Sequence, residues 1–209
     1  TREGNRLYGI GSNDDGASLV SLLQTFRTLY HTPLPCNLLF LASAEEEVSG
    51  HEGIEQMIPL LPHIDVAIVG EPTGMQPAIA EKGLMVLDVT EHGKAGHAAR
   101  DEGDNAIYHA LDDMQRIRNR EWEKVSPLLG KVKTTITIVN AGTQHNVIPD
   151  QCTFTIDVRS NELYSNQELF QLISKEIHGE VKARSFRLNS SHIPTHHPLV
   201  QALISMGKV

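Results

Sequence analysis

Residues 84–91 read LMVLDVTE, residues 133–139 read KTTITIV and residues 153–159 read TFTIDVR. In each stretch, apolar side chains alternate with side chains that tolerate water. This alternation is typical of a strand that buries one face and leaves the other wet. The three stretches therefore predict an antiparallel sheet that is covered on one side only.

Two amphipathic helices are expected between these strands, over residues 104–119 and 166–178, because their apolar residues recur at helical spacing. A further strand is expected over residues 182–188. The resulting order β-α-β-β-α-β predicts a ferredoxin-like α+β domain over residues 83–190.

The residues before this domain have a different pattern. Residues 16–30 carry apolar side chains at helical spacing, and residues 50–60 are also expected to be helical. Residues 37–44 (NLLFLASA) and 65–70 (DVAIVG) are apolar runs without a polar face, as in strands buried on both sides. The alternation of helices and buried strands predicts an α/β layer with a largely parallel sheet.

A last helix is expected over residues 198–206, where the chain would return to the α/β layer. Residues 1–82 and 191–209 are therefore predicted to be parts of one α/β domain. Residues 83–190 would be an insertion into it.

Composition argues against several classes of protein. The chain has 18 Lys and Arg against 26 Asp and Glu, a net charge of −8, which disfavours a nucleic-acid partner because phosphate binding needs a basic face. No apolar run approaches the ~18 to 20 residues that span a bilayer, so no membrane partner is expected. With Cys36 and Cys152 as the only cysteines, no disulfide framework is expected and a reducing cytoplasm fits.

Acidic residues occupy equivalent places in the predicted α/β layer. Asp14 and Asp15 stand in a Gly-rich turn before a helix, while residues 45–47 (EEE) and Glu71 each follow a predicted strand. Loops at the carboxyl ends of strands in an open α/β sheet meet in one crevice, so these carboxylates are expected to converge. Their mutual repulsion is costly unless cations neutralise it.

Each acidic residue also has an ordinary structural explanation. Asp14 could cap the helix that follows it, a common role for Asp. Residues 45–47 could form a solvated turn, and Glu71-Pro72 could be only a loop. These explanations are adequate one by one, but they do not explain why every predicted strand end in this half carries an acid.

Five motifs occur in order along the chain. They are residues 9–16 (GIGSNDDG), 43–47 (SAEEE) with Gly53, 69–73 (VGEPT), 93–99 (GKAGHAA), and 146–149 (NVIP) leading to 157–159 (DVR). Together they resemble the acetylornithine deacetylase, succinyl-diaminopimelate desuccinylase and aminoacylase family of zinc hydrolases. The resemblance implies a zinc-peptidase-like α/β catalytic domain with an inserted dimerisation or lid domain.

The resemblance also implies a site with two zinc ions, for which cobalt or manganese could substitute. Asp14 would bridge the two ions, Glu71 would complete one zinc site and Glu47 the other. Glu46 would be the general base that takes a proton from the metal-bridging water. Carboxylates suit this work because they bind zinc at ~2.0 to 2.2 Å and can span two ions ~3.5 to 4 Å apart.

In the inserted domain, the resemblance implies that His97 reaches the active site of the partner subunit of a homodimer and stabilises the tetrahedral oxyanion. Asn146 would help to hold the substrate, and His145 beside it could line the site. Arg159 would bind a substrate carboxylate with its bidentate fork. His97 could instead be an ordinary turn histidine, and Arg159 could belong to a structural ion pair.

The activity implied is hydrolysis of the amide bond of an N-acyl amino acid, a small-molecule substrate. Gly16 with Ser12 and Asn13 resembles the acetylornithine deacetylase branch of arginine biosynthesis. A dipeptidase, an aminoacylase or a succinyl-diaminopimelate desuccinylase on the same scaffold stays open. So does a non-catalytic relative that keeps the fold for dimerisation or ligand binding.

Two histidine ligands of the family have no counterpart in residues 1–209. They belong to an N-terminal His-x-Asp motif and to a region near the family's C-terminus. We therefore expect the whole protein to be longer at both ends. We also expect this chain alone to bind zinc poorly and to be inactive, because one private carboxylate and the bridge are too few for a zinc site.

Overall fold

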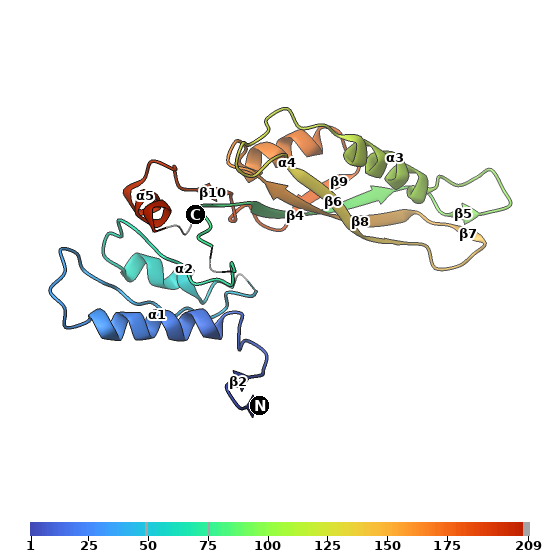
Figure 1. The fold of residues 1–209 in the computed structure, drawn as a ribbon. Helices are drawn as coiled ribbons and strands as arrows, with labels where there is room; N and C mark the ends of the chain where they lie inside the picture. Colours follow the sequence, from blue (N-terminus) through green and yellow to red (C-terminus); the bar gives the residue numbers. More distant parts are fainter. Residues whose placement is uncertain (49, 75, 207–209) are drawn as a thin grey trace. The chain divides into compact units, whose positions relative to one another are not determined.

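The computed structural model describes residues 1–48, 50–74 and 76–206, which divide into two compact units, Thr1–Gln76 and Pro77–Val209. The second unit is built on a four-stranded antiparallel sheet, and the first contains helices and short extended segments (Figure 1). No helix in these described ranges is long and apolar enough to cross a membrane.

The sheet of the second unit has the strand order β6-β8-β4-β9. Its members are β4 (Gly83–His92), β6 (Lys133–Ala141), β8 (Gln151–Ser160) and β9 (Glu180–Ala183). Strands β4 and β8 pair over their whole length, with Gly83 opposite Ser160 and His92 opposite Gln151. Buried and less buried residues alternate along β4, which confirms that one face of the sheet is covered.

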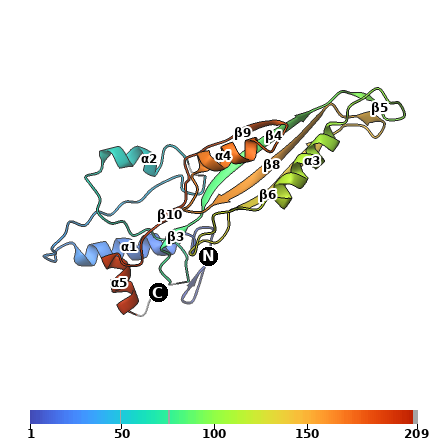
Figure 2. The same ribbon diagram turned by 90° about the horizontal axis from the view of Figure 1, so that it is seen from above.

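Two helices, α3 (Ala106–Asn119) and α4 (Asn166–Ser174), cover one face of this sheet (Figures 1 and 2). Side-chain caps begin both helices: Asn105 accepts from the Ile107 N–H at 3.0 Å, and Ser165 accepts from the Glu168 N–H at 3.1 Å. Between helices and sheet lies one apolar core that includes Leu87, Val89, Ala110, Ile117, Phe154, Ile156, Leu169 and Ile173. Each large apolar side chain buried there contributes ~1.5 to 3 kcal/mol to folding.

The predicted order β-α-β-β-α-β is confirmed, but its last two elements are shorter than predicted. The helix expected to reach residue 178 ends at Ser174, and the last strand ends at Ala183 instead of residue 188. Beyond that strand the side-chain amide of Asn166 donates to the carbonyl oxygens of Phe186 and Leu188, at 3.5 and 2.9 Å. Residues 184–188 are therefore held by the Asn166 side chain outside the regular strand.

Asn166 also joins the entry and exit of this domain. Its amide donates to the Leu84 carbonyl oxygen at 3.2 Å, in addition to its bond to Leu188. The Leu84 N–H donates to the Leu188 carbonyl oxygen at 2.8 Å. Where the chain enters the sheet and where it leaves, it is therefore held at a single point.

Shorter elements complete the second unit. Strand β5 (Gly96–His97) pairs with β7 (Val147–Ile148), and β3 (Ala80–Glu81) pairs with β10 (Ser191–His192). Helix α5 (Pro198–Ser205) confirms the helix predicted near the end of the chain.

The second compact unit includes the segment that follows residue 190. From its sequence, the segment 191–209 was assigned to the α/β domain, and residues 207–209 of it lie outside the described residues. That assignment stays a prediction.

The first unit contains the hairpin of β1 (Arg2–Glu3) and β2 (Arg6–Leu7), helix α1 (Gly16–Leu29), the short helix α2 (Ile54–Met57) and the 3₁₀ turn η1 (Ile58–Leu60). Helix α1 confirms the helix predicted over residues 16–30. The helix predicted over residues 50–60 forms only from Ile54 onward, as α2 and η1.

The two strands predicted over residues 37–44 and 65–70 do not form in the described part of the chain. Apolar side chains of both segments are exposed, with Leu39 at 54% and Val69 at 77%. A strand needs a neighbour to pair its N–H and C=O groups, and neither segment has a ladder partner among the described residues. The mixed α/β class is confirmed, but the placement of these two strands was wrong for this structure.

Candidate functional site

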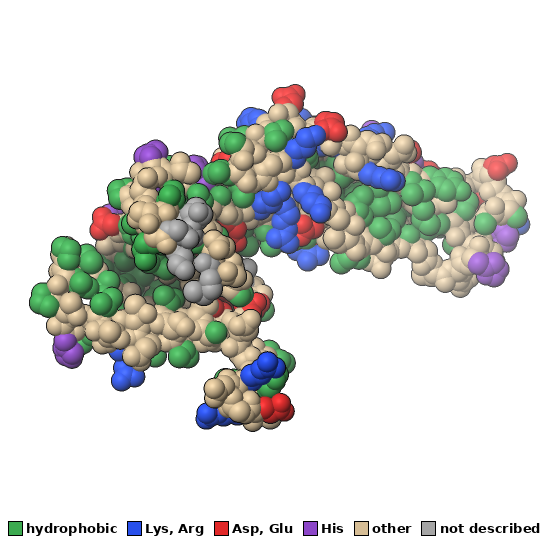
Figure 3. Space-filling model, in the orientation of Figure 1, with side chains coloured by type: hydrophobic (Ala, Val, Ile, Leu, Met, Phe, Trp, Pro, Cys, Tyr) green, Lys and Arg blue, Asp and Glu red, His purple; other side chains and the backbone are tan. Residues whose placement is uncertain are grey.

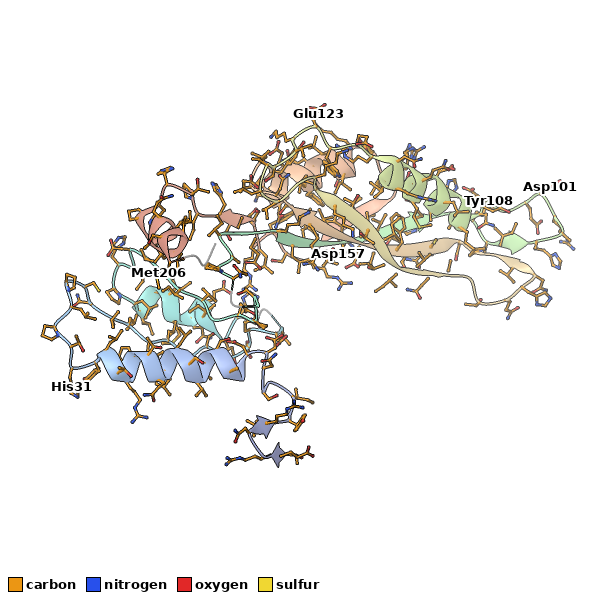
Figure 4. All side chains as sticks on the ribbon, in the orientation of Figure 1. His31, Asp101, Tyr108, Glu123, Asp157 and Met206 are labelled. Carbon is orange, nitrogen blue, oxygen red and sulfur yellow. The ribbon has the colours of Figure 1, made fainter. Side chains whose placement is uncertain are left out.

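Two predicted site residues lie at the β5–β7 ribbon: His97 is in β5, and Asn146 directly precedes β7. His97 is opposite Val147 in the ladder, and the Ala98 N–H donates to the Asn146 carbonyl oxygen at 3.0 Å. Both side chains are exposed. Asp101 marks the outer end of the loop that carries His97 (Figure 4). The structure thus brings two separate sequence motifs together at one end of the second unit.

A local hydrogen bond orients the ring of His97. The backbone N–H of Ala99 donates to Nδ1 of His97 at 3.1 Å. A ring nitrogen that accepts an N–H bond carries no proton, so the proton of the neutral imidazole lies on Nε2. The exposed Nε2–H is therefore available as a hydrogen-bond donor.

The loop that carries His97 is closed at its base. The N–H of Lys94 donates to the Asp104 carbonyl oxygen at 2.7 Å, and the reverse bond measures 2.9 Å. Nε2 of His109 on α3 lies 2.6 Å from Oδ1 of Asp104, which ties the loop to the helix. A Cβ on Gly103 would meet Cδ1 of Ile148 at 2.7 Å, so a side chain at this position would force Ile148 to shift.

A pocket of about 460 Å³ lies beside the ribbon. Its lining includes Asn105, Thr143 and His145, so hydroxyl, amide and imidazole groups stand among apolar ones. Of the turn before Asn146, the sequence interpretation named only His145. The signal of the turn was Gly142, which has φ of 70° and so takes the left-handed backbone that glycine favours.

Arg159 lies on β8, apart from the ribbon, and forms a bidentate ion pair with Asp157. Nε of Arg159 donates to Oδ1 at 2.8 Å, and Nη2 donates to Oδ2 at 3.1 Å. Asp157 projects from the face of the sheet that the helices leave open (Figure 4). The guanidinium of Arg159 therefore already binds a carboxylate. This is the structural ion pair that was considered as the alternative to substrate binding.

In the first unit, Asp14, Glu46, Glu47 and Glu71 all have exposed side chains. Asp14 does not cap helix α1: the N-cap position belongs to Asp15, whose side chain makes no capping hydrogen bond. Helix capping, the structural explanation considered for Asp14, is therefore not what this residue does in the structure.

Close contacts show how the acidic turns are built. A Cβ on Gly70 would meet Cβ of Ser18 at 2.8 Å, so the residue before Glu71 packs against the start of α1. Glu45, with φ of 58°, accepts the Glu52 N–H on Oε2 at 3.0 Å. Glu45 therefore shapes its own turn.

The metal-ligand assignment is not assembled in this structure. Among the residues that the structure describes, no group of three or more His, Cys, Asp and Glu side chains could hold a metal ion. Carboxylates are chemically suitable zinc ligands, but Asp14, Glu47 and Glu71 form no such group. Their assignment stays a prediction, and no reaction step is derived through a metal ion.

The second unit matches a known sequence family. The family model described as the peptidase dimerisation domain (M20_dimer) matches residues 79–184, about half of the chain. This range contains every element of the β-α-β-β-α-β domain, including the ribbon that carries His97.

Curated relatives extend the similarity across the first unit. Acetylornithine deacetylase of Edwardsiella ictaluri is 28% identical over 221 residues, which cover 97% of this chain and 57% of that protein. Succinyl-diaminopimelate desuccinylase of Gluconobacter oxydans is 28% identical over 179 residues, which cover 80% of this chain and 47% of that protein. The chain thus spans about half the length of the curated relatives it matches.

Among solved structures, a tripeptidase of Staphylococcus aureus subsp. aureus Mu50 has the same fold. It matches with a TM-score of 0.67 at 18% identity, over 96% of this chain and 56% of that chain.

Proposed function

The chain belongs to the M20 peptidase family, and from this we propose that it takes part in metal-dependent hydrolysis of the amide bond of an N-acyl amino acid. The relatives named acetylornithine deacetylase and succinyl-diaminopimelate desuccinylase support this class of substrate. The observation that carries the proposal is the β5–β7 ribbon, which presents an exposed imidazole donor and is bonded through Ala98 to the backbone of Asn146.

His97 is proposed to stabilise the oxyanion of the tetrahedral intermediate. A neutral imidazole with its proton on Nε2 can donate to a developing negative charge without giving up that proton. Losing one such donor typically costs ~10²- to 10³-fold in kcat. Asn146 is proposed to hold the substrate beside it, since its amide can donate to a carbonyl or carboxylate oxygen.

Two metal ions are part of the proposal, zinc in the first place with cobalt or manganese as substitutes. Asp14 would bridge them, and Glu47 and Glu71 would each bind one. When bound, the metal would polarise the scissile carbonyl and lower the pKa of the attacking water. These three carboxylates are too few for two zinc sites, so the proposal requires further ligands.

Glu46 is proposed as the residue that moves the proton. A carboxylate can take a proton from the attacking water and then return it to the leaving amine. Glu45, which is held in its turn by the Glu52 N–H, would orient Glu46 and Glu47 without binding the substrate itself.

A homodimer formed through the second unit is also proposed, with a small-molecule substrate bound at each site. Strand β6 is an edge strand, and its Ile138 and Val139 are about half exposed, at 49% and 50%. Tyr108 (Figure 4) and Leu111 on α3 are exposed as well, and apolar side chains gather on this side of the unit (Figure 3). An exposed apolar edge is a template for pairing with a second copy. His97 would then act in the partner's site.

Arg159 is retained in the proposal as a residue that binds a substrate carboxylate. Its pair with Asp157 is partly exposed, so a substrate carboxylate could displace Asp157 at modest cost. A cytoplasmic location is proposed as well, because Cys36 and Cys152 are both free thiols.

The closest alternatives are a dipeptidase or aminoacylase on the same scaffold, and a non-catalytic binding protein. The fold shared with a tripeptidase favours testing peptides beside N-acyl amino acids. The acyl group, the amine and a place in arginine biosynthesis are the finer points of the proposal, and the substrate panel decides them.

The test uses the full-length protein loaded with zinc or cobalt. N-acetylornithine, N-acetylcitrulline, N-succinylcitrulline, succinyl-diaminopimelate, dipeptides and tripeptides are offered, and release of the free amine is measured. We expect turnover of an N-acyl amino acid that falls ~10²- to 10³-fold in kcat in His97→Ala. The exposed His92→Ala is the matched control. A metal-loaded protein that hydrolyses none of these substrates would contradict the proposal.

A further inference from the structure

Two acidic side chains meet inside the second unit, away from the β5–β7 ribbon. Glu91 on β4 is 4% exposed and Asp113 on α3 is 0% exposed. The backbone of Gly179 contacts both: a Cβ there would meet Oε1 of Glu91 at 2.2 Å, and its N–H donates to Oδ2 of Asp113 at 3.4 Å. Two carboxylates in contact and out of water cannot both ionise cheaply, so this contact requires one proton between them.

Asp113 is the partner that stays ionised. Its Oδ2 accepts the His178 N–H at 2.6 Å and the Gly179 N–H at 3.4 Å, and Arg116 donates to its Oδ1. Burial acts to raise the pKa of Asp113, but the hydrogen bonds from Glu91, His178 and Gly179 outweigh it and hold that pKa below its ordinary value.

Glu91 is the partner that holds the proton. Burial, reinforced by the hydrogen bond to Asp113 and the charge of Asp113, raises the pKa of Glu91 to about 7. A backbone hydrogen bond from Gly179 acts the other way and lowers this pKa, but it does not outweigh the burial. A protonated carboxyl tolerates such a place far better than a charged one.

The turn after α4 is seated directly on Glu91. A Cβ on Gly179 would meet Oε1 of Glu91 at 2.2 Å and the Thr90 carbonyl oxygen at 2.7 Å. The backbone of this turn also donates to Asp113, so one carboxyl pair contacts β4, α3 and the turn together. Any repulsion between the two carboxyls acts on all three elements.

The other titratable groups around Glu91 come from every neighbouring element. His109 acts on it electrostatically from α3, and Cys152 of β8 is its ladder partner. His178 lies in the turn, with Nδ1 3.0 Å from Asp113, and Glu180 of β9 stands opposite Thr90. None of these is a proposed metal ligand or part of the proposed catalytic group.

We propose that Glu91 and Asp113 form a proton-sharing lock, which fastens α3 and the turn before β9 onto β4 below neutral pH and loosens them above it. The lock operates within this chain and does not depend on the proposed hydrolysis. The lock controls how tightly α3 packs against β4. Helix α3 also carries the exposed side chains of Tyr108 and Leu111.

The direction of the pH effect follows from linkage. A carboxyl whose pKa rises on folding makes the folded state more stable at low pH, and this contribution is lost as the pH rises through the folded value. For Glu91 the loss runs from its ordinary value of 4.5 to about 7. The lowered pKa of Asp113 acts in the opposite direction, but only in acid near its ordinary value of 3.8. The window of the lock is therefore about pH 5 to 8.

Trp122 makes the test specific to this unit. It is the only tryptophan of the chain, and it is buried in the core of the second unit at 5% exposure. Urea unfolding of the 209-residue chain is followed by its fluorescence at pH 5, 6.5 and 8. We expect the folding equilibrium constant of the wild-type chain to fall on the order of 10- to 100-fold over this range.

Two variants separate the lock from other titrations. Glu91→Gln keeps the shape and removes the titration, so we expect most of the pH slope to disappear. Asp112→Asn changes the exposed neighbour of Asp113 on the same helix, and we expect it to keep the wild-type slope. All eleven histidines are present in all three proteins. A Glu91→Gln chain with the wild-type slope would overturn the proposal.

A second measurement stands even if Glu91→Gln fails to fold. Carboxyl ¹³C NMR of the wild-type chain follows the titration of Glu91 directly. We expect a midpoint near the value of about 7. A midpoint in the ordinary range, ~4 to 5, would overturn the proposal without reference to any variant.

Discussion

The backbone N–H of Ala99 lies 3.1 Å from Nδ1 of His97 and donates to it, so a residue two positions along the chain sets the tautomer of the ring. We predict that ¹⁵N NMR of the neutral form finds the proton of His97 on Nε2. His92, which is exposed on β4, is the control and should show an exchanging mixture. An Nδ1–H signal for His97 would contradict the assignment and weaken its proposed role as a donor.

Gly93 is predicted to be intolerant of a side chain. A Cβ there would meet the Asp104 carbonyl oxygen at 2.2 Å and the Ala106 N at 2.8 Å, and backbone atoms cannot move aside cheaply. We expect Gly93→Ala to destabilise the second unit by ~1 to 3 kcal/mol and to open the base of the His97 loop. Urea unfolding gives the first quantity, and hydrogen exchange of residues 94–104 gives the second.

Gly9→Ala is the matched control for that substitution. Nothing lies within 4 Å of the position where its Cβ would stand, so its stability should change by only a few tenths of a kcal/mol. Equal effects of the two substitutions would mean that the contact between Gly93 and Asp104 does not constrain the loop.

Arg184 binds Asp88 on the open face of the sheet through both arms of its guanidinium, at 2.7 and 2.9 Å. The hydrogen bond from Arg184 is the main cause that lowers the pKa of Asp88, so this pair stabilises the fold above the ordinary value of 3.8 and loses its contribution as the pH falls. Because both side chains are about half exposed, we expect Arg184→Lys to cost only ~0.5 kcal/mol at pH 7.

Chemical denaturation at pH 7 and at pH 3 checks this prediction. The difference between Arg184→Lys and wild type should shrink at the lower pH, because the pair loses its contribution as the pH falls. Lys182→Ala, which removes an exposed pair with Glu180, is the control and should be nearly neutral. A difference that grows in acid would contradict the ion-pair explanation.

Glu46→Ala in the full-length, metal-loaded protein tests the proposed proton transfer. We expect turnover to fall by ~10²- to 10⁴-fold with the metal content unchanged, because general acid–base catalysis contributes about that much. Metal content is measured by atomic absorption. Glu123→Gln, an exposed acid of the second unit, serves as the control. Unchanged turnover in Glu46→Ala would show that another group moves the proton.

The sequence predicts the second unit well because its signal is local. Along β4, Met85, Leu87 and Val89 recur at every second position and all enter the core. Pairing partners for β4 lie within the same chain, so the alternation that predicts each strand and the ladder that forms it agree.

The first unit shows where such prediction fails. Residues 37–44 and 65–70 have the composition of buried strands, but composition does not supply a neighbour with which to pair. The sequence likewise predicts which residue types suit a metal, but whether Asp14, Glu47 and Glu71 meet depends on long-range packing that no local pattern contains.

The buried carboxyl pair was missed although a signal was present. Glu91 continues the inward series of Met85, Leu87 and Val89 at a spacing of two. On α3, Asp113 falls among Ala106, Ala110 and Ile117, the residues that the helix buries. When two neighbouring elements each carry an acidic residue at a position of the buried face, the sequence therefore predicts a buried carboxyl pair.

The bond between Leu84 and Leu188, with the Asn166 amide across both, has an evolutionary consequence. The two ends of the segment between Leu84 and Leu188 lie next to each other. A chain that receives this segment as an insertion therefore has to open at only one position of its backbone. Such a module can be gained, exchanged or lost as a unit without changing the path of the chain around it.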